Sequence, residues 1–250
     1  VGEIAAACVA GVMTMETGME LAVQRSRLMQ VCVCGDKFVC HFGLTFRFAF
    51  PRPFLHQALP TGDGFKVSAR CSVDAVTATI DTLGVQAKAS VASVNGPKSV
   101  VVAGAEAEVA AVLAELGQEG KQLSVSHAFH SPLMKGIAEE FRAVVKSVEL
   151  SANKVPLAST VTGGMATVKD VTDPEHWVRQ LWSPVQYSSA LEAALTWRGE
   201  DEEGSSIWTL LEVGADTVLT RMAKSWAGKV VEHPLEWHAS MDRRAGLEDM

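Results

Sequence analysis

The sequence predicts an α/β fold in which a parallel-sheet body carries a smaller inserted unit. Outside the insert, strands alternate with helices, which is the pattern of a parallel sheet joined by helical crossovers. Inside it, residues 64–125 follow the order βαββαβ, the order of a ferredoxin-like unit whose two ends lie close together. A chain of 250 residues is long enough to bury a substantial core in two unequal parts.

The composition is typical of a globular protein and narrows the function classes. The chain is 48% hydrophobic and 20% charged, which argues against disorder. Its net charge of −7 argues against a nucleic-acid-binding surface. No apolar run approaches the roughly 20 residues that cross a bilayer, and the first residues include Glu3 and no basic segment, unlike a signal peptide. Five unevenly placed cysteines fit a reducing cytoplasm better than a disulfide framework.

Two helices are predicted at the start of the chain. The first covers residues 2–11 and ends at Gly11, and the second begins after Thr14 as its N-cap. Arg25 falls within the apolar stripe of the second helix, four residues after Leu21. A buried arginine needs an anion, because an unpaired buried charge costs several kcal/mol. That anion is either a structural salt-bridge partner or the carboxylate of a substrate.

Residues 31–57 differ from the rest of the chain. They hold six of the nine Phe and three of the five Cys, with no helical or strand period. Their cysteine and histidine spacing matches no common zinc site. Val-Cys-Val-Cys can be encoded by a GT repeat, the Phe-rich middle by a pyrimidine tract and the final Gln57 by CAG. We therefore expect a non-native insert, a retained intron. Transcript reads that join residue 30 directly to residue 58 would support this, and continuous reads would refute it.

The smaller unit, residues 58–125, has clear element boundaries. Gly84 and Gly117 follow helical patterns, and Asn95-Gly96-Pro97 is typical of a turn between two strands. The predicted elements are a strand at 65–69, a helix at 73–83, strands at 87–94 and 99–103, a helix at 105–116 and a strand at 121–125.

The rest of the body, residues 126–228, begins with the segment SHAFHSPLM, and residues 229–250 are expected to form a polar tail or linker. Asp173-Pro174 is typical of a helix start. The predicted elements are helices at 133–148, 174–181, 187–197 and 217–226, and strands at 156–161 and 207–213.

Six motifs, in this order, resemble the acyltransferase domains of polyketide synthases and the malonyl-CoA:acyl-carrier-protein transacylases: GEIAAACVAG, QRSRLMQ, VNGPKSVVVAG, VSHAFHSPLM, WVRQLWSPVQY and LLEVGADTVL. Each motif is weak alone, but six in the right order are specific. The resemblance implies an α/β-hydrolase-like body, formed by residues 1–30 and 126–228, with the ferredoxin-like unit inserted in it. It also implies a cytoplasmic protein that works beside an acyl carrier protein and a ketosynthase, without metal or permanent cofactor.

In that family the nucleophile is the serine of a Gly-His-Ser-x-Gly turn followed by Glu. Here Val1-Gly2-Glu3 match only the end of this motif, so the serine is expected immediately before Val1. We therefore expect the N-terminal part of the domain to be missing and this chain to be inactive alone. Two alternatives stay open: an acyltransferase remnant that acts as an interaction module, and an α/β serine hydrolase, against which Arg25 argues.

The resemblance also assigns roles to individual residues. His130 matches the base that takes the serine proton and returns one to the departing thiol. Gln180 matches the glutamine whose backbone carbonyl orients the imidazole. The N–H of Val1, which would follow the serine, is expected to donate to the oxyanion. Arg25 matches the arginine that pairs with the malonyl carboxylate. The implied reaction moves malonyl from coenzyme A to the serine and then to the phosphopantetheine thiol of the carrier.

Three more residues are candidates for substrate binding. His127 to His130 resemble the HAFH signature of malonyl-selective domains, in which Phe129 would crowd the space needed by an α-methyl group. Excluding one methyl is worth about 1–3 kcal/mol. His127 and Asn95 are further candidates, for which a structural role is the alternative.

Overall fold

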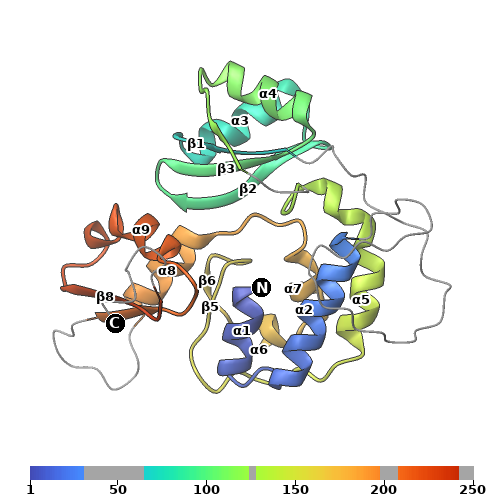
Figure 1. The fold of residues 1–250 in the computed structure, drawn as a ribbon, viewed down its shortest axis with the longest axis vertical. Coiled ribbons are helices and arrows are strands. Elements are labelled where there is room, and N and C mark those ends of the chain that lie inside the picture. Colours follow the sequence, from blue (N-terminus) through green and yellow to red (C-terminus); the bar gives the residue numbers. More distant parts are fainter. Residues whose placement is uncertain (31–64, 124–127, 198–207, 242–250) are drawn as a thin grey trace.

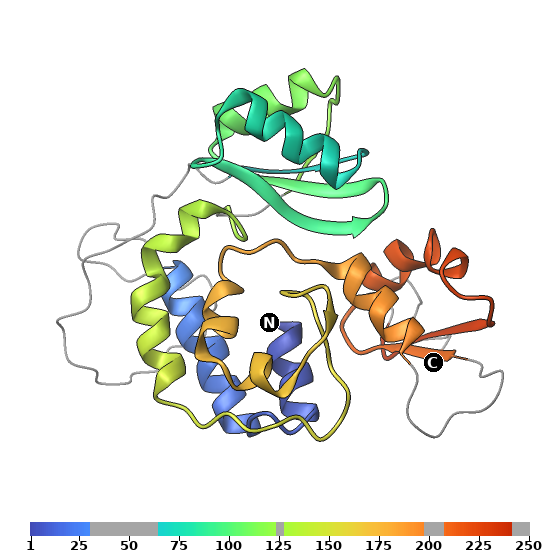
Figure 2. The same cartoon turned by 180° about the vertical axis from the view of Figure 1, so that it is seen from behind.

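The computed structural model describes residues 1–30, 65–123, 128–197 and 208–241. A small subdomain (residues 65–123) lies above a helical body, and a third group of elements near the C-terminus lies to one side (Figures 1 and 2). Within these described ranges, no helix is both long and apolar enough to span a membrane.

The small subdomain is a four-stranded antiparallel sheet with two helices, and its βαββαβ order is the predicted one. Its strands lie in the order β2-β3-β1-β4. Ser72 begins α3 by accepting a hydrogen bond from the backbone of Ala75 at 3.3 Å, and Gly84 ends it at φ +67°. The elements are β1 (Phe65–Ala69), α3 (Val73–Leu83), β2 (Ala89–Gly96), β3 (Ser99–Gly104), α4 (Glu106–Glu115) and β4 (Lys121–Gln122).

The two faces of this sheet have different partners. Val67, Val100 and Val102 face the helices α3 and α4 and form the core of the small subdomain. Strand residues alternate between faces, so Val101 and Ala103 point to the other side. There they pack against Ala128 and Leu133, which belong to the SHAFHSPLM segment. The second face of the sheet therefore supports the segment that carries His130.

The helical body packs around one apolar core (Figure 1). Thr14 caps its second helix by accepting a hydrogen bond from the Thr17 backbone at 3.2 Å, as predicted. The helix predicted at 133–148 is divided into a 3₁₀ turn and an α-helix. The elements are α1 (Gly2–Val9), α2 (Met15–Gln30), the 3₁₀ turn η2 (Pro132–Ile137), α5 (Ala138–Lys146), α6 (Val168–Thr172) and α7 (Pro174–Arg179).

The described residues do not form the expected parallel-sheet body. The strand predicted at 156–161 is reduced to β5 (Ala158–Ser159), which pairs antiparallel with β6 (Gly164–Met165). At the next residue, the backbone N–H of Thr160 donates to the Glu3 carboxylate at 3.1 Å and so does not pair with a neighbouring strand.

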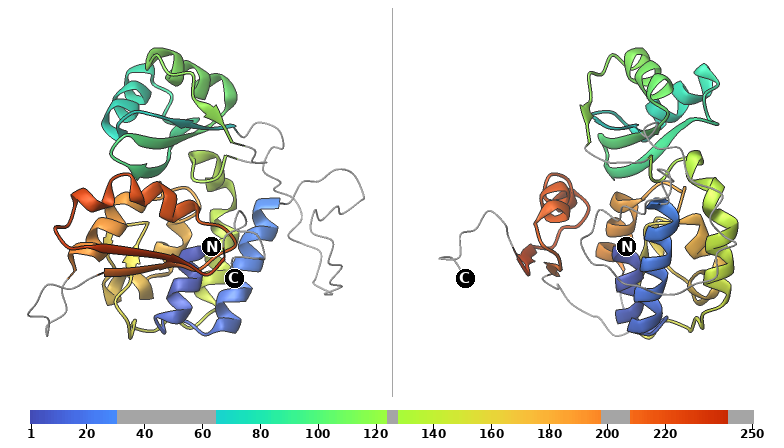
Figure 3. Two further views of the ribbon diagram at one scale, coloured as in Figure 1. Left: turned by 60° about the vertical axis from the view of Figure 1, so that its left-hand side comes forward. Right: turned by 45° about the vertical axis from the view of Figure 1, so that its right-hand side comes forward.

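The prediction of a polar tail or linker at residues 229–250 is also wrong in part. β8 (Leu235–Ala239) lies in this region and pairs in parallel with β7 (Trp208–Glu212). Leu235 and Trp237 alternate with polar residues and pack in a cluster with Trp226. This group is completed by α8 (Tyr187–Thr196), α9 (Val218–Lys224) and the short 3₁₀ turn η3 (Ala227–Lys229). Figure 3 shows α9 beside the two strands.

Candidate active site

His130 is held by both subdomains. Its backbone N–H donates to the carbonyl of Leu181 at 3.2 Å, and its own carbonyl accepts from the Ser90 hydroxyl, on β2, at 3.3 Å. Its φ of +62° is the only positive value at a non-glycine residue in the described part of the chain. Such a conformation costs on the order of 1–3 kcal/mol, and it persists only where the surroundings impose it.

The imidazole of His130 is neutral at pH 7. Its pKa is lowered to about 4, first by burial and then by the positive charges of Lys66, Arg25 and the amino terminus. Nδ1 lies 3.1 Å from the carbonyl oxygen of Ser183. A carbonyl only accepts, so Nδ1 carries the proton and Nε2 has the lone pair. This is the tautomer of a general base.

The carbonyl that orients the imidazole belongs to Ser183, so the prediction for Gln180 is wrong. The Gln180 carbonyl accepts instead from Arg25 Nη2 at 3.5 Å, and its side-chain Oε1 accepts from Nη1 at 3.3 Å. α7 ends at Arg179, and a further turn follows in which the N–H groups of Trp182 and Ser183 donate to the Arg179 carbonyl. This turn brings the carbonyl three residues after Gln180 to the ring.

Arg25 faces inward, as its position in the apolar stripe predicted. It is 6% exposed, and its pKa is lowered by burial, while the negative charge of Glu3 opposes this. No carboxylate in the described part of the chain forms an ion pair with it. Its two hydrogen bonds to Gln180 are long. The guanidinium is therefore a buried cation without a structural salt bridge.

The amino group at the start of α1 interacts electrostatically with Arg25 and His130. The Val1 side chain is exposed, but burial and the charge of Arg25 lower the pKa of its amino group to about 6. The charge of this amino group in turn acts on His130. The N-terminus lies at the end of α1 that faces the small subdomain (Figures 1 and 2).

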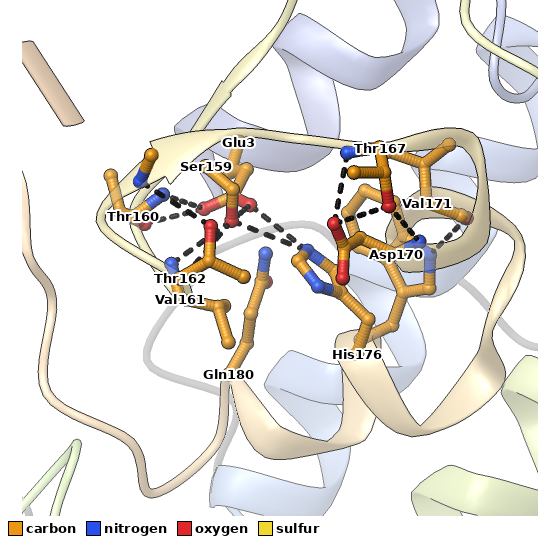
Figure 4. Close-up of polar contacts among 12 residues, drawn as sticks. Glu3, Ser159, Thr160, Val161, Thr162, Thr167, Asp170, Val171, His176 and Gln180 are labelled. Atoms are coloured by element: carbon orange, nitrogen blue, oxygen red, sulfur yellow. Dashed lines mark hydrogen bonds and ion pairs between the residues drawn. The ribbon is translucent and has the colours of Figure 1, made fainter. Parts of the chain in front are cut away.

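The start of α1 is fixed by a buried polar network around Glu3 (Figure 4). The carboxylate accepts from the Ser159 hydroxyl at 2.7 Å, from the Thr160 backbone and hydroxyl, and from His176 Nε2 at 3.2 Å. Burial raises the pKa of Glu3, but the hydrogen bonds from His176, Thr160 and Ser159 together hold it below its ordinary value. Sequence reasoning used Glu3 only as part of a motif and did not find this role.

Ser131 and Ser90 do not serve as nucleophiles for His130. The Ser131 hydroxyl is fully buried, donates to the Ala128 carbonyl at 2.7 Å and caps η2. The Ser90 hydroxyl donates to the backbone carbonyl of His130. Both hydroxyl protons are therefore directed at carbonyl oxygens.

Phe129 lies beside a cation that sequence reasoning missed. Its ring packs against the core of the body, and Nζ of Lys66 lies 5.7 Å from the ring centroid. The sequence carried one signal for this lysine. In the strand FKVSA it alternates with Val67 and Ala69 and so faces away from the helices of the small subdomain.

Asn95, another substrate candidate, makes its contacts away from His130. Asn95 lies near the β2–β3 turn, where its side chain contacts Ser93 and its carbonyl accepts from the Trp226 indole at 3.0 Å. These contacts join β2 to the C-terminal group and favour the structural alternative. His127 lies outside the described residues, as does the segment 31–57.

Comparison with known proteins identifies the chain. The acyl transferase domain family matches residues 65–215, which is more than half of the chain. The chain belongs to this acyltransferase family. It is 36% identical over 225 residues to polyketide synthase GfsB of Streptomyces halstedii, covering 89% of this chain and 3% of that synthase.

Solved acyltransferase structures have the same fold. The acyltransferase domain from the second module of the salinomycin polyketide synthase matches with a TM-score of 0.74 and 30% identity, covering 98% of this chain and 48% of that chain. The malonyl CoA-acyl carrier protein transacylase from Clostridium perfringens matches with a TM-score of 0.72 and 19% identity, covering 96% and 65%. The acyltransferase chain described here thus spans about half of that salinomycin structure.

This part of the acyltransferase supplies a base and a cation whose charge acts on that base. His130 is neutral with Nε2 available, and Arg25 is positive, buried and not ion-paired within the described ranges. Together they can take a proton from a hydroxyl or thiol and bind an anionic group close by.

Proposed function

We propose that this acyltransferase transfers a malonyl group from coenzyme A to the phosphopantetheine thiol of an acyl carrier protein, through a serine that precedes Val1. The observation that carries the proposal is Arg25: it is buried, it forms no ion pair within the described residues, and its charge acts on the neutral His130. A hydrolase for uncharged acyl groups would have no use for such a cation.

In the first half-reaction, the serine hydroxyl gives its proton to Nε2 of His130 while its oxygen attacks the thioester carbonyl. The resulting oxyanion is stabilised by the N–H of Val1 at the amino end of α1. The C–S bond then breaks, and His130 returns the proton to the departing coenzyme A thiol. The carrier thiol repeats these steps in the second half-reaction and frees the serine.

The Ser183 carbonyl keeps the imidazole of His130 in the required tautomer. Because the ring is neutral at pH 7, it can accept a proton without first losing one. The positive charges around it lower the pKa of the imidazolium, so the proton is readily returned to the leaving thiol. The long Gln180 contacts leave Arg25 able to turn toward a carboxylate, which would form two charge-assisted bonds with it.

The wider setting is part of the same proposal. We infer an α/β-hydrolase-like body completed by further strands, with the βαββαβ unit inserted as the ferredoxin-like subdomain. The partners are a carrier protein and a neighbouring ketosynthase in a polyketide or fatty-acid synthase. Phe129 restricts the α-position of the acyl group, which favours malonyl over methylmalonyl.

The test is covalent loading. The chain is joined at Val1 to an upstream acyltransferase segment that ends in Gly-His-Ser, with and without residues 31–57, and loading from malonyl-CoA and acetyl-CoA is followed by intact-protein mass. We expect malonyl loading, its loss in His130→Ala, and a fall of about 100-fold in malonyl preference in Arg25→Ala, because two charge-assisted hydrogen bonds are lost.

Arg27→Ala is the matched control, because Arg27 lies on the exposed side of the same helix. It should load like the parent protein. Equal loading of acetyl and malonyl groups by the parent, or unchanged preference in Arg25→Ala, would contradict the proposal.

A further inference from the structure

Lys66 projects from the small subdomain toward the site. It lies in β1, where its neighbours Val67 and Ala69 fill the core beneath α3 and α4. Alternation along the strand places Lys66 on the opposite face. That face supports the SHAFHSPLM segment through Ala128. Lys66 is thus a charged residue at the boundary between the small subdomain and the body.

The Lys66 ammonium group lies over the ring of Phe129. Nζ lies 5.7 Å from the centroid of the Phe129 ring, which is within the range of a cation–π interaction. The ring is itself packed against the core of the body. An aromatic face holds a cation in position without neutralising it, and with a pKa of about 8, Lys66 is mostly protonated at pH 7.

Lys66 and Arg25 are two partly or fully buried cations whose charges both act on His130. Burial lowers the pKa of Lys66 to about 8, and its charge and that of Arg25 both act on His130. In the described ranges, neither cation forms an ion pair with a carboxylate. Of the titratable groups at the start of the neighbouring α1, the Val1 amino group has a pKa of about 6 and is mostly neutral at pH 7. The Glu3 carboxylate already accepts bonds from Ser159, Thr160 and His176.

Such a concentration of positive charge in a partly dehydrated site attracts an anion. We propose that Lys66 is a substrate-recognition residue, a second cation that acts with Arg25 to select acyl groups with a free carboxylate. This inference rests on the proposed function and adds a contact from the small subdomain to it. The acyl carboxylate is the favoured anion, because the charges of both cations act on His130, the residue that acts at the acyl group.

The test measures binding of malonyl-CoA and acetyl-CoA to the 250-residue chain by titration calorimetry. Both ligands carry the same phosphates, so their affinity ratio isolates the carboxylate. We expect Lys66→Met to weaken malonyl-CoA binding by about fivefold, as for a partly exposed charge pair, and to leave acetyl-CoA unchanged. Lys66→Arg should retain the malonyl preference. Lys121→Met, an exposed position on the neighbouring β4, is the control and should change neither affinity.

Equal weakening of both ligands would mean that Lys66 binds the phosphates of coenzyme A and would overturn the inference, as would unchanged affinities. Failure of the proposed function has a different signature, in which the parent chain already binds both ligands equally or Arg25→Ala leaves malonyl-CoA affinity unchanged. If Lys66→Met does not fold by circular dichroism, Lys66→Gln is measured in its place.

Discussion

Replacing Glu3 by Gln should destabilise the protein strongly, although the two side chains have nearly the same size. The Glu3 side chain is 7% exposed, so water does not screen its interactions. Each carboxylate oxygen accepts from two donors: Oε1 from Ser159 and His176, and Oε2 from the backbone and hydroxyl of Thr160.

An amide can accept at only one of these two positions. In either orientation its NH₂ group meets two donors. In one orientation the NH₂ group faces the Thr160 backbone N–H, which cannot turn away. In the other it faces His176 Nε2, which can accept only if the ring proton moves to the buried Nδ1, where no partner is present among the described residues. A buried unsatisfied donor costs about 1–3 kcal/mol, and hydrogen bonds to a charged group are worth about 1.5–3 kcal/mol. We expect Glu3→Gln to lower the free energy of unfolding by about 3 kcal/mol.

The assay is urea unfolding at pH 7 followed by circular dichroism, with Glu106→Gln as the control. Glu106 is an exposed glutamate in the first turn of α4, and its change should cost no more than about 0.5 kcal/mol. The folded-state pKa of Glu3 lies below its ordinary value of 4.5. Its stabilisation is therefore complete above pH 4.5 and disappears as the pH falls through the folded-state pKa.

The difference between the parent protein and Glu3→Gln should accordingly shrink on acidification below pH 4.5. A Glu3→Gln protein as stable as Glu106→Gln at pH 7 would refute the reasoning, because it would mean that the network contributes no net stability.

Two other predictions concern the site and the small subdomain. The His130 ring should titrate by NMR with a pKa of about 4, and this pKa should rise in Lys66→Met. Because the folded-state pKa is lowered, the free energy of unfolding should fall as the pH drops below 6.5. A titration near 6.5 would contradict the assigned environment. Gly104→Ala should lower the free energy of unfolding in urea by about 3 kcal/mol, because its Cβ would lie 2.0 Å from the Lys88 carbonyl oxygen. Gly164→Ala is the control: its Cβ would meet nothing within 4 Å, so the change should be nearly neutral. Equal stability of these two variants would contradict the close approach of the Lys88 carbonyl.

Local signals in the sequence predicted the ends of several elements correctly. Ser72 and Gly84 limit α3, Thr14 caps α2, and Asp173 caps α7 by accepting from the Glu175 backbone at 2.9 Å. Such caps depend on backbone groups two to four residues away, so they can be read from neighbouring residues alone.

The errors concern contacts between distant parts of the chain. β5 ends at Ser159, and the N–H of the next residue, Thr160, is bonded to Glu3, more than 150 residues earlier in the chain. The alternation in Leu235–Ala239 is a strand signal, but its pairing with β7 depends on the packing of the C-terminal group around Trp226. Register and partner choice are long-range properties that periodicity does not encode.

The sequence by itself determined the βαββαβ order, the helix caps, the inward direction of Arg25 and the motifs that carry the acyltransferase resemblance. Only the tertiary structure decided that Ser183 rather than Gln180 orients His130, that Arg25 has no ion-pair partner among the described residues, and that Lys66 adds a second cation. Periodicity tells which face of an element a side chain occupies. The atoms opposite that face depend on how separately built subdomains pack together.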